Sequence, residues 1–140
     1  MSFKEIWNAV YTQLLGVKTT SPAVAEVYNH EVKESTSYPY IAITPTDVKE
    51  DVLDQLQNES NYNFTIRLID KNKDIREMEA RMRELADLVL TKLRDMGHQI
   101  TLTNGTSIKL TWSWNWGWLD EQEPLRVFNI ILTWNILEYL

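Results

Sequence analysis

The stretch DIREMEARMRELADLVLTKLRDMG, residues 74–97, repeats an apolar side chain every three or four positions. This spacing is typical of a helix that lays one apolar stripe on a hydrophobic surface. The stripe consists of Ile75, Met78, Met82, Leu85, Val89, Leu93 and Met96. Asp74 and Glu77 form a capping box before it, and Gly97 is a typical residue for a helix end. The pattern predicts a helix over 75–96, about 33 Å long and able to span a sheet.

Charged side chains support this helix on its outer side. Glu77–Arg81 and Glu79–Arg83 are spaced four residues apart with the acid first, which is the favourable order for an ion pair on a helix. These side chains are therefore expected to face water.

A second amphipathic helix is predicted at the start of the chain. Ser2 and Glu5 form a capping box, and Gly16 is a typical residue for the end of the helix. The apolar residues between them recur at helical spacing; they are Phe3, Ile6, Trp7, Val10 and Leu14. We expect a helix over 3–15, followed by a loop over 17–23.

Strands are predicted between the two helices. Apolar residues from Tyr62 to Leu68 alternate with polar ones, which is typical of a strand with one buried face. Ile41 and Ile43 share a face of a short strand that Pro39 and Pro45 should bound, because proline has no N–H for the ladder. A weaker strand is expected over 24–32. The acidic segment 47–60 is predicted to be either a short helix or a projecting loop.

The last third of the chain is predicted to be strand. Asn104-Gly105 is a typical hairpin signal, and a three-residue loop of 103–105 would pair Ile100 with Ile108 on one apolar face. The strand then carries four tryptophans at alternate positions, in TWSWNWGW, residues 111–118. The final strand, 128–136, alternates in the same way. Any antiparallel pairing with an even residue sum places both apolar rows on one face and leaves the other face polar and nearly uncharged.

These elements predict one domain over 1–140 of the α+β class, with an antiparallel sheet and both the N-terminal helix and the long helix packed on one of its faces. The length of 140 residues is sufficient for a hydrophobic core. No linker, repeat or low-complexity tract divides the sequence.

Composition excludes several classes of protein. The net charge is −6 and the pI is about 4.9, with no basic run that could grip a nucleic-acid backbone. The sequence has no cysteine, so it has no disulfide framework or thiolate metal site. The first residues do not resemble a signal peptide, and no apolar run is long enough to cross a bilayer. We expect a protein made and assembled in a cytoplasm, without a membrane partner.

The sequence offers little to catalysis. His30 and His98 are the only histidines and neither has a neighbour at metal-ligand spacing. No phosphate-binding glycine loop and no nucleophile motif occur. Carboxylates cluster in two segments, at Asp47, Glu50, Asp51 and Asp54, and at Asp120, Glu121 and Glu123. Both clusters fall on expected turns or exposed faces. We predict no catalytic residue, no metal site and no cofactor. We therefore expect that the protein is not an enzyme.

The tryptophan row allows three interpretations. It can be a sheet face covered by the helices, an interface with a protein partner, or an aromatic platform for sugar rings. Ile108 and Leu110 continue the same face, which favours the core. The row extends about 20 Å, so its end can outrun the helices. Trp116 and Trp118, nearest the turn, are the residues expected to reach a neighbouring subunit.

Three segments, SYPYIAITPTD (37–47), YNFTIRLID (62–70) and LRVFNIILTWNI (125–136), together with the order of elements, resemble the tail terminator family of long-tailed phages. Members of this family, also called tail completion or tail-to-head joining proteins, carry an amphipathic helix, a PYI strand, a Y-x-F-x-I strand, a long helix and a terminal hairpin. The resemblance covers nearly the whole chain. The tryptophans at 112–118 are not part of the family pattern.

The resemblance implies a structural virion protein. Such proteins form a hexameric ring on the tail tube, stop its polymerisation and join it to the head connector or neck protein, while DNA passes through the lumen without specific binding. The residues expected at subunit or partner interfaces are Trp116, Trp118, Asp120, Glu121, Asp47, Glu50, Asp51 and Asp54. The alternatives are a neck or head-completion adaptor, and a carbohydrate-binding module built on Trp114, Trp116 and Trp118.

Overall fold

The computed structural model describes residues 3–20, 23–32, 37–54, 57–72, 74–104, 107–118 and 124–139. Within these ranges the side chains of 4–20, 23–32, 37–46, 60–72, 74–97, 108–113 and 125–135 are described. The elements in chain order are α1 (Phe3–Leu15), the 3-10 helix η1 (Gly16–Lys18), β1 (Glu26–Tyr28), β2 (Tyr40–Asp54), β3 (Gln57–Lys71), α2 (Ile75–Asn104), β4 (Ser107–Trp118) and β5 (Pro124–Tyr139).

The strands form one sheet in the order β1-β2-β3-β5-β4. Every neighbouring pair is antiparallel except β1–β2, which is parallel, so the expected antiparallel sheet has one parallel strand at its edge. In the β4–β5 register Ile108 pairs with Trp134 and Trp112 pairs with Ile130. These residue sums are even, so the predicted pairing of the two apolar rows is confirmed.

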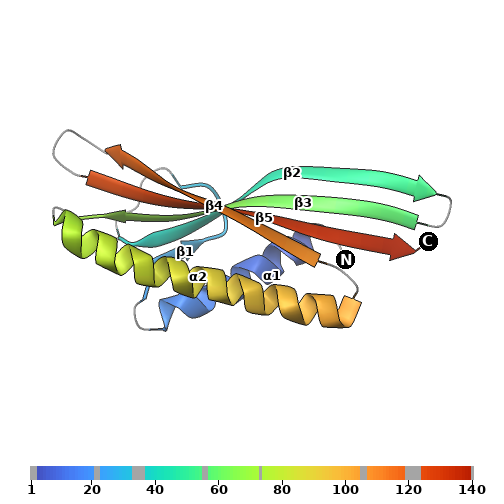
Figure 1. The fold of residues 1–140 in the computed structure, drawn as a ribbon, viewed down its shortest axis with the longest axis horizontal. Coiled ribbons are helices and arrows are strands. Elements are labelled where there is room, and N and C mark those ends of the chain that lie inside the picture. The colour runs from blue at the N-terminus through green and yellow to red at the C-terminus, as the bar shows by residue number, and fades with distance from the viewer. Residues whose placement is uncertain are drawn as a thin grey trace.

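Both helices cover the same face of the sheet, as Figure 1 shows, and the predicted α+β architecture is confirmed. The main core lies between the helices and this face. Its sheet residues include Ile41, Ile43, Phe64, Ile66, Leu68, Phe128, Ile130, Leu132 and Trp134. The stripe of α2 is buried from Met78 to Met96, whereas Ile75 at the start of the helix is 46% exposed. At the helix start the Glu77 N–H donates to the Asp74 carboxylate at 3.2 Å, as the capping box predicts.

A small second cluster lies on the opposite face, near β1. Tyr40, Ala42 and Ile69 are buried there, and Tyr28 and Tyr38 pack edge-on against the ring of Tyr40. The expected strand over 24–32 is only three residues long, because after Tyr28 the chain leaves the sheet and contributes Val32 to this cluster. This cluster anchors one end of the sheet and leaves the rest of that face open.

The helix α2 does not end at Gly97, and the predicted hairpin around residues 103–105 is wrong. The helix continues to Asn104, and β4 begins only at Ser107. Gly97 lies inside the helix where α2 approaches β4 closely: a methyl group at this position would overlap the side chain of Ile108. The glycine is therefore explained by close packing of a helix on a strand, not by a helix stop.

We expect Gly97→Ala to lower the free energy of unfolding by about 1 kcal/mol, although alanine usually stabilises a helix interior by about that amount. The overlap with Ile108 forces the helix and strand apart, which costs about 2 kcal/mol. Denaturant unfolding followed by circular dichroism measures the change. The variant Gly97→Ala/Ile108→Ala should lose less than the sum of the two single variants. A stabilising Gly97→Ala would contradict the close approach.

The acidic segment 47–60 is neither a loop nor a helix. It forms the distal half of a long β2–β3 hairpin, in which Val48 pairs with Tyr62 and Glu50 with Ser60. Pro45 does not end β2, because the strand has a register shift between Pro45 and Asp47 and has β1 beside it only at 40–42. Figure 1 shows that this hairpin and the end of β5 extend beyond the C-terminal end of α2.

Candidate functional site

The predicted interface residues do not form one cluster. Trp118 pairs with Pro124 at the start of β5, whereas the tip of the β2–β3 hairpin, at Gln57, pairs with Tyr139 at its end. These two points are separated by the full length of β5, about 50 Å. Trp116 and Trp118 therefore lie at one end of the sheet and the acidic residues of β2 toward the other, as the positions of β4 and β2 in Figure 1 show.

The structure fixes these residues to different degrees. The backbone positions of Trp116, Trp118, Asp47, Glu50, Asp51 and Asp54 are set by strand pairing, but their side chains lie outside the described ones. Asp120 and Glu121 lie outside the described residues altogether. Their expected contacts stay predictions. What the fold does establish is that the tryptophans and the acidic residues belong to opposite edges of one sheet.

The two edges of the sheet are both long and open. β4, with 12 residues, is the last strand on one side, and no described strand pairs with its outer edge. On the other side β1 covers only Tyr40–Ala42 of β2, so Ile43–Asp54 has no described neighbour beyond β3. A strand edge exposes backbone N–H and C=O groups that can pair with another chain. Both edges therefore offer backbone groups to which a further strand can bind.

An apolar shelf runs beside the β4 edge on the helix-covered face. Trp112 is 50% exposed there, and the Arg94 guanidinium lies 5.8 Å from its ring centroid. A groove between α2 and β4 has Trp112 on one side and Arg83 and Asp87 on the other, with the buried Ala86, Leu90 and Phe128 at its base. The inward side chains of β5 from Phe128 to Trp134 are buried, whereas Trp112 on β4 is only half covered. The edge strand therefore presents a half-exposed indole together with its open backbone.

The tryptophan question receives a divided answer. Trp134 on β5 is 1% exposed and belongs to the main core, whereas Trp112 on β4 is half exposed. The two residues face the same side of the sheet, so the difference arises from strand order: β5 is an inner strand and β4 is an edge. Within the row on β4 only the side chain of Trp112 is described, and it is half exposed. The side chains of Trp114, Trp116 and Trp118 lie outside the described ones, so the interpretation of these three stays a prediction.

An ion pair between Arg81 of α2 and the buried Asp70 of β3 joins the helix to the sheet. Arg81 was expected on the outer side of the helix, but its Nε and Nη2 each donate to Asp70 at 2.8 Å. The Asp70 side chain is fully buried, and burial raises the pKa of this carboxyl despite the hydrogen bonds and charge of Arg81, which oppose the rise. The sequence signal for this pair was weak: Asp70 continues the inward-facing positions of β3 after Leu68.

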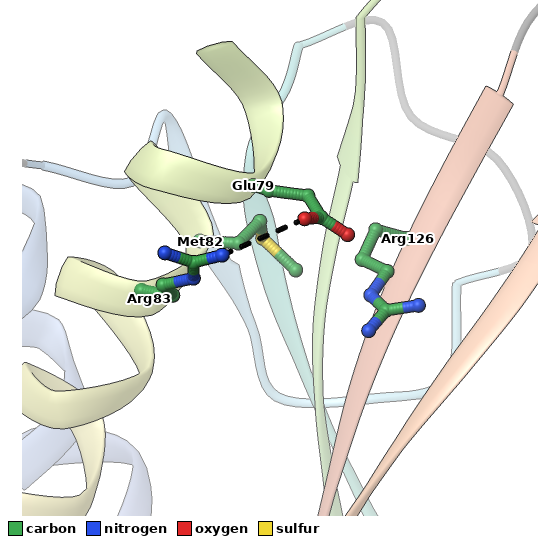
Figure 2. A pocket seen from close by; sticks show the side chains of 4 residues that line it. All are labelled: Glu79, Met82, Arg83 and Arg126. Carbon is green, nitrogen blue, oxygen red and sulfur yellow. Dashed lines mark ion pairs between the residues drawn. The ribbon is translucent and has the colours of Figure 1, made fainter. Parts of the chain in front are cut away.

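The pocket in Figure 2 lies between the start of α2 and the start of β5. Glu79 pairs with Arg83 at 3.7 Å, Met82 forms the apolar wall, and Arg126 approaches from β5. The pocket therefore has one carboxylate between two guanidinium groups, and its described lining residues include neither a second carboxylate for acid–base chemistry nor a nucleophile. Within the described ranges no group of His, Cys, Asp or Glu is arranged to hold a metal ion.

The open face of the sheet is polar and hydrogen-bonded across strands. Thr133 donates to the side-chain oxygen of Asn63 at 2.6 Å, and Asn135 donates to that of Asn61 at 2.8 Å. Ile131, at 47% exposure, is the large apolar exception on this face. Arg67 and Glu31 form the one charged pair described there, at 3.8 Å. The predicted polar and nearly uncharged surface is found around Asn61, Asn63 and Thr133, whereas Lys109 also lies on this face and an apolar cluster occupies its β1 end.

The chain matches no protein-family model, and no curated protein shows significant similarity to it. In the part of the chain that the structure describes, no helix is long and apolar enough to cross a membrane. Any assignment of function must therefore be carried by the residues and by the fold.

Proposed function

We propose that this protein is a phage tail terminator, a virion protein that forms a ring on the end of the tail tube. The observation that carries the proposal concerns the part of the chain that the structure describes. There the helices cover one face of the sheet, no described strand pairs with the outer edge of β4 or with Ile43–Asp54 on the outer edge of β2, and the elements follow the order typical of that family. An N-terminal helix precedes the strand that starts at Tyr40, and a long helix separates the β2–β3 hairpin from the terminal β4–β5 hairpin. Ring assembly needs two different edges on each subunit, and this sheet has them.

The charge of the chain agrees with a conduit for DNA. The net charge is −6, and the described open face of the sheet carries amides and hydroxyls together with the Arg67–Glu31 pair and two separate lysines, Lys71 and Lys109. Phosphate backbones bind clustered Lys and Arg, so such a surface lets DNA pass without holding it. The projecting β2–β3 hairpin is the segment that we propose contacts the tube protein or lines the channel.

Two alternatives make different predictions. A neck or head-completion adaptor would use the same ring but dock on the head connector and not on the tube. A carbohydrate-binding module would use Trp114, Trp116 and Trp118, and needs their indoles in water in the isolated protein. Trp112, on the same row, is half exposed, which agrees equally with an interface beside an open strand edge.

The proposal is tested by growing tail tubes from the tube protein of the same phage genome, with and without this protein. We expect shorter tubes that carry a ring at one end in electron micrographs, because a bound terminator blocks addition of further tube subunits. A variant truncated in the β2–β3 hairpin, with Lys49–Ser60 replaced by a short turn, is expected to keep its fold and lose capping. Tubes of unchanged length with bare ends would contradict the terminator assignment.

A further inference from the structure

The two open edges of the sheet are complementary to each other in direction and chemistry. β2 and β5 run one way, and β3 and β4 run the other way. When copies of the chain follow one another in the same orientation, β4 of one copy therefore lies antiparallel to β2 of the next. Antiparallel pairing is the more stable arrangement of strands.

The open edges also overlap in height. Through the pairing with β5 and β3, Ser107 of β4 is level with Lys49 of β2, and Trp112 is level with Ile43. Copies placed side by side can therefore form a ladder between Ser107–Trp112 of one copy and Ile43–Lys49 of the next. Roughly half of the backbone N–H and C=O groups of an edge strand point away from its one partner. Pairing the two edges satisfies these groups on both strands at once.

The charges of the two edges favour pairing of β4 with β2 over pairing of β2 with β2. Lys109 is the one charged residue of β4. The free part of β2 carries one lysine and four acidic residues, which are Asp47, Glu50, Asp51 and Asp54. Pairing of β2 with β2 would bring these like charges together, which is unfavourable directly across strands. Pairing of β2 with β4 avoids that repulsion and gives Lys109 an acidic partner strand.

The β4 edge lacks the features by which proteins protect an edge strand. It contains no proline and no described bulge, and a single charge interrupts a row of tryptophans and hydroxyl residues. Trp112 is half exposed on the shelf beside it. The β2 edge, in contrast, has Pro45 and a register shift, which limit pairing along that edge. A ladder on β2 is therefore interrupted at Pro45, which has no N–H to donate.

From these observations we infer that the partner of the β4 edge is the free edge of β2 in a second copy of this chain, so that the sheet continues from subunit to subunit. This inference rests on the proposed function for its ring, but the edge contact can be tested separately. The contact is heterologous, since each subunit uses two different surfaces, and it closes into a ring or continues as a filament. Trp112 then lies beside the added strand, where its indole loses contact with water.

The experiment uses the absence of cysteine, which makes any introduced thiol unique. Thr111→Cys is placed on β4 and Thr46→Cys on β2; both residues are exposed, and both lie on the open face, since Thr111 pairs with the outward Ile131 and Thr46 contacts Thr65. The two variants, made at different lengths with an affinity tag on one, are mixed and treated with a short bismaleimide linker. The mixture is tested as the free protein at high concentration and on capped tubes.

We expect the dominant cross-linked product to join Thr46→Cys to Thr111→Cys, with few products of either variant alone. The control is Ala80→Cys, an exposed position on α2, mixed with each variant. A product from Thr111→Cys alone would overturn the inference in favour of a two-fold β4–β4 dimer. Cross-linking no greater than in the Ala80→Cys control, in the free protein and on capped tubes, would also overturn it.

The two claims fail in distinguishable ways. If tubes are capped but the β4–β2 product is absent from the caps, the terminator assignment stands and the edge contact is wrong. If the β4–β2 product forms in the free protein while tubes grow unchanged, the edge contact stands and the terminator assignment is wrong.

Discussion

Replacement of Trp134 by alanine is expected to lower the free energy of unfolding by about 4 kcal/mol. The indole is 1% exposed on an inner strand, directly across from Ile108 and within the main core. The helix and the strands on either side restrict collapse around the vacated volume, so the loss of buried surface and the cavity both contribute. Denaturant unfolding at one fixed protein concentration measures the change, since association would otherwise shift the midpoint.

Trp112→Ala is the matched control for this variant. The same residue type, on the same face but on the edge strand, is half exposed, and we expect a loss of about 1 kcal/mol from partial burial and the Arg94 contact. Trp134→Phe should cost much less than Trp134→Ala, because it keeps an aromatic ring and removes a buried indole N–H that has no acceptor among the described residues. Equal losses for Trp134→Ala and Trp112→Ala would contradict the difference in burial between these two residues.

Arg81→Met is expected to lower the free energy of unfolding at pH 7 by about 3 kcal/mol, since it leaves the carboxylate of Asp70 buried without its cation. Both hydrogen bonds from the guanidinium to Asp70 are lost, and the backbone N–H of Lys71 remains as the donor described at this carboxylate. Met keeps most of the apolar stem, so the change reports mainly on the charge. Arg83→Met is the matched control on α2: its 75%-exposed side chain pairs with Glu79, and we expect a loss below about 0.5 kcal/mol.

The loss of stability in Arg81→Met is expected to depend on pH. Burial already raises the pKa of Asp70 with Arg81 present, and loss of that cation raises the pKa further. The folded state then holds a proton that the unfolded chain releases at the ordinary Asp pKa, so stability falls as the pH rises between the ordinary and the raised pKa. We therefore expect the deficit of Arg81→Met relative to wild type to shrink as the pH is lowered from 7 toward 4. A deficit independent of pH, or one equally present in Asp70→Asn/Arg81→Met, would contradict this account.

The sequence predicted best where local pattern and tertiary packing favour the same structure. The stripe of α2 and the alternation on β3 and β5 repeat over many residues, and each repeat buries apolar surface, so these elements and their shared face were predictable. The Asp74 cap followed from local chemistry alone. Few arrangements of helix and sheet bury both the apolar stripe of the helix and the apolar rows of the strands, so the pattern restricts the fold.

The failures have specific causes. From the sequence alone Gly97 is interpreted as a helix stop. In the structure the position requires glycine because the side chain of Ile108, on β4, leaves no room for a methyl group. The acidic residues of β2 have low strand propensity, yet β3 lies alongside β2, and β5 pairs with the full length of β3, so tertiary pairing overrides local preference there. The Asp70–Arg81 pair was missed because Arg81 was predicted to pair with Glu77 on the outer side of the helix, whereas it donates to Asp70 on the sheet. Strand order was not encoded in any local pattern, and it decides which tryptophans are buried and which edges are open.

The most direct test of the central claim is the solution mass, by light scattering, of the protein alone and mixed with the tail tube protein of the same genome. The account predicts either a hexamer in isolation or a monomer that caps tubes and limits their mass, because edge pairing between copies is completed on the tube. A monomer that leaves the mass of the tubes unchanged at every mixing ratio would contradict it, and a sugar-binding role for the tryptophan row would then be the next hypothesis to test.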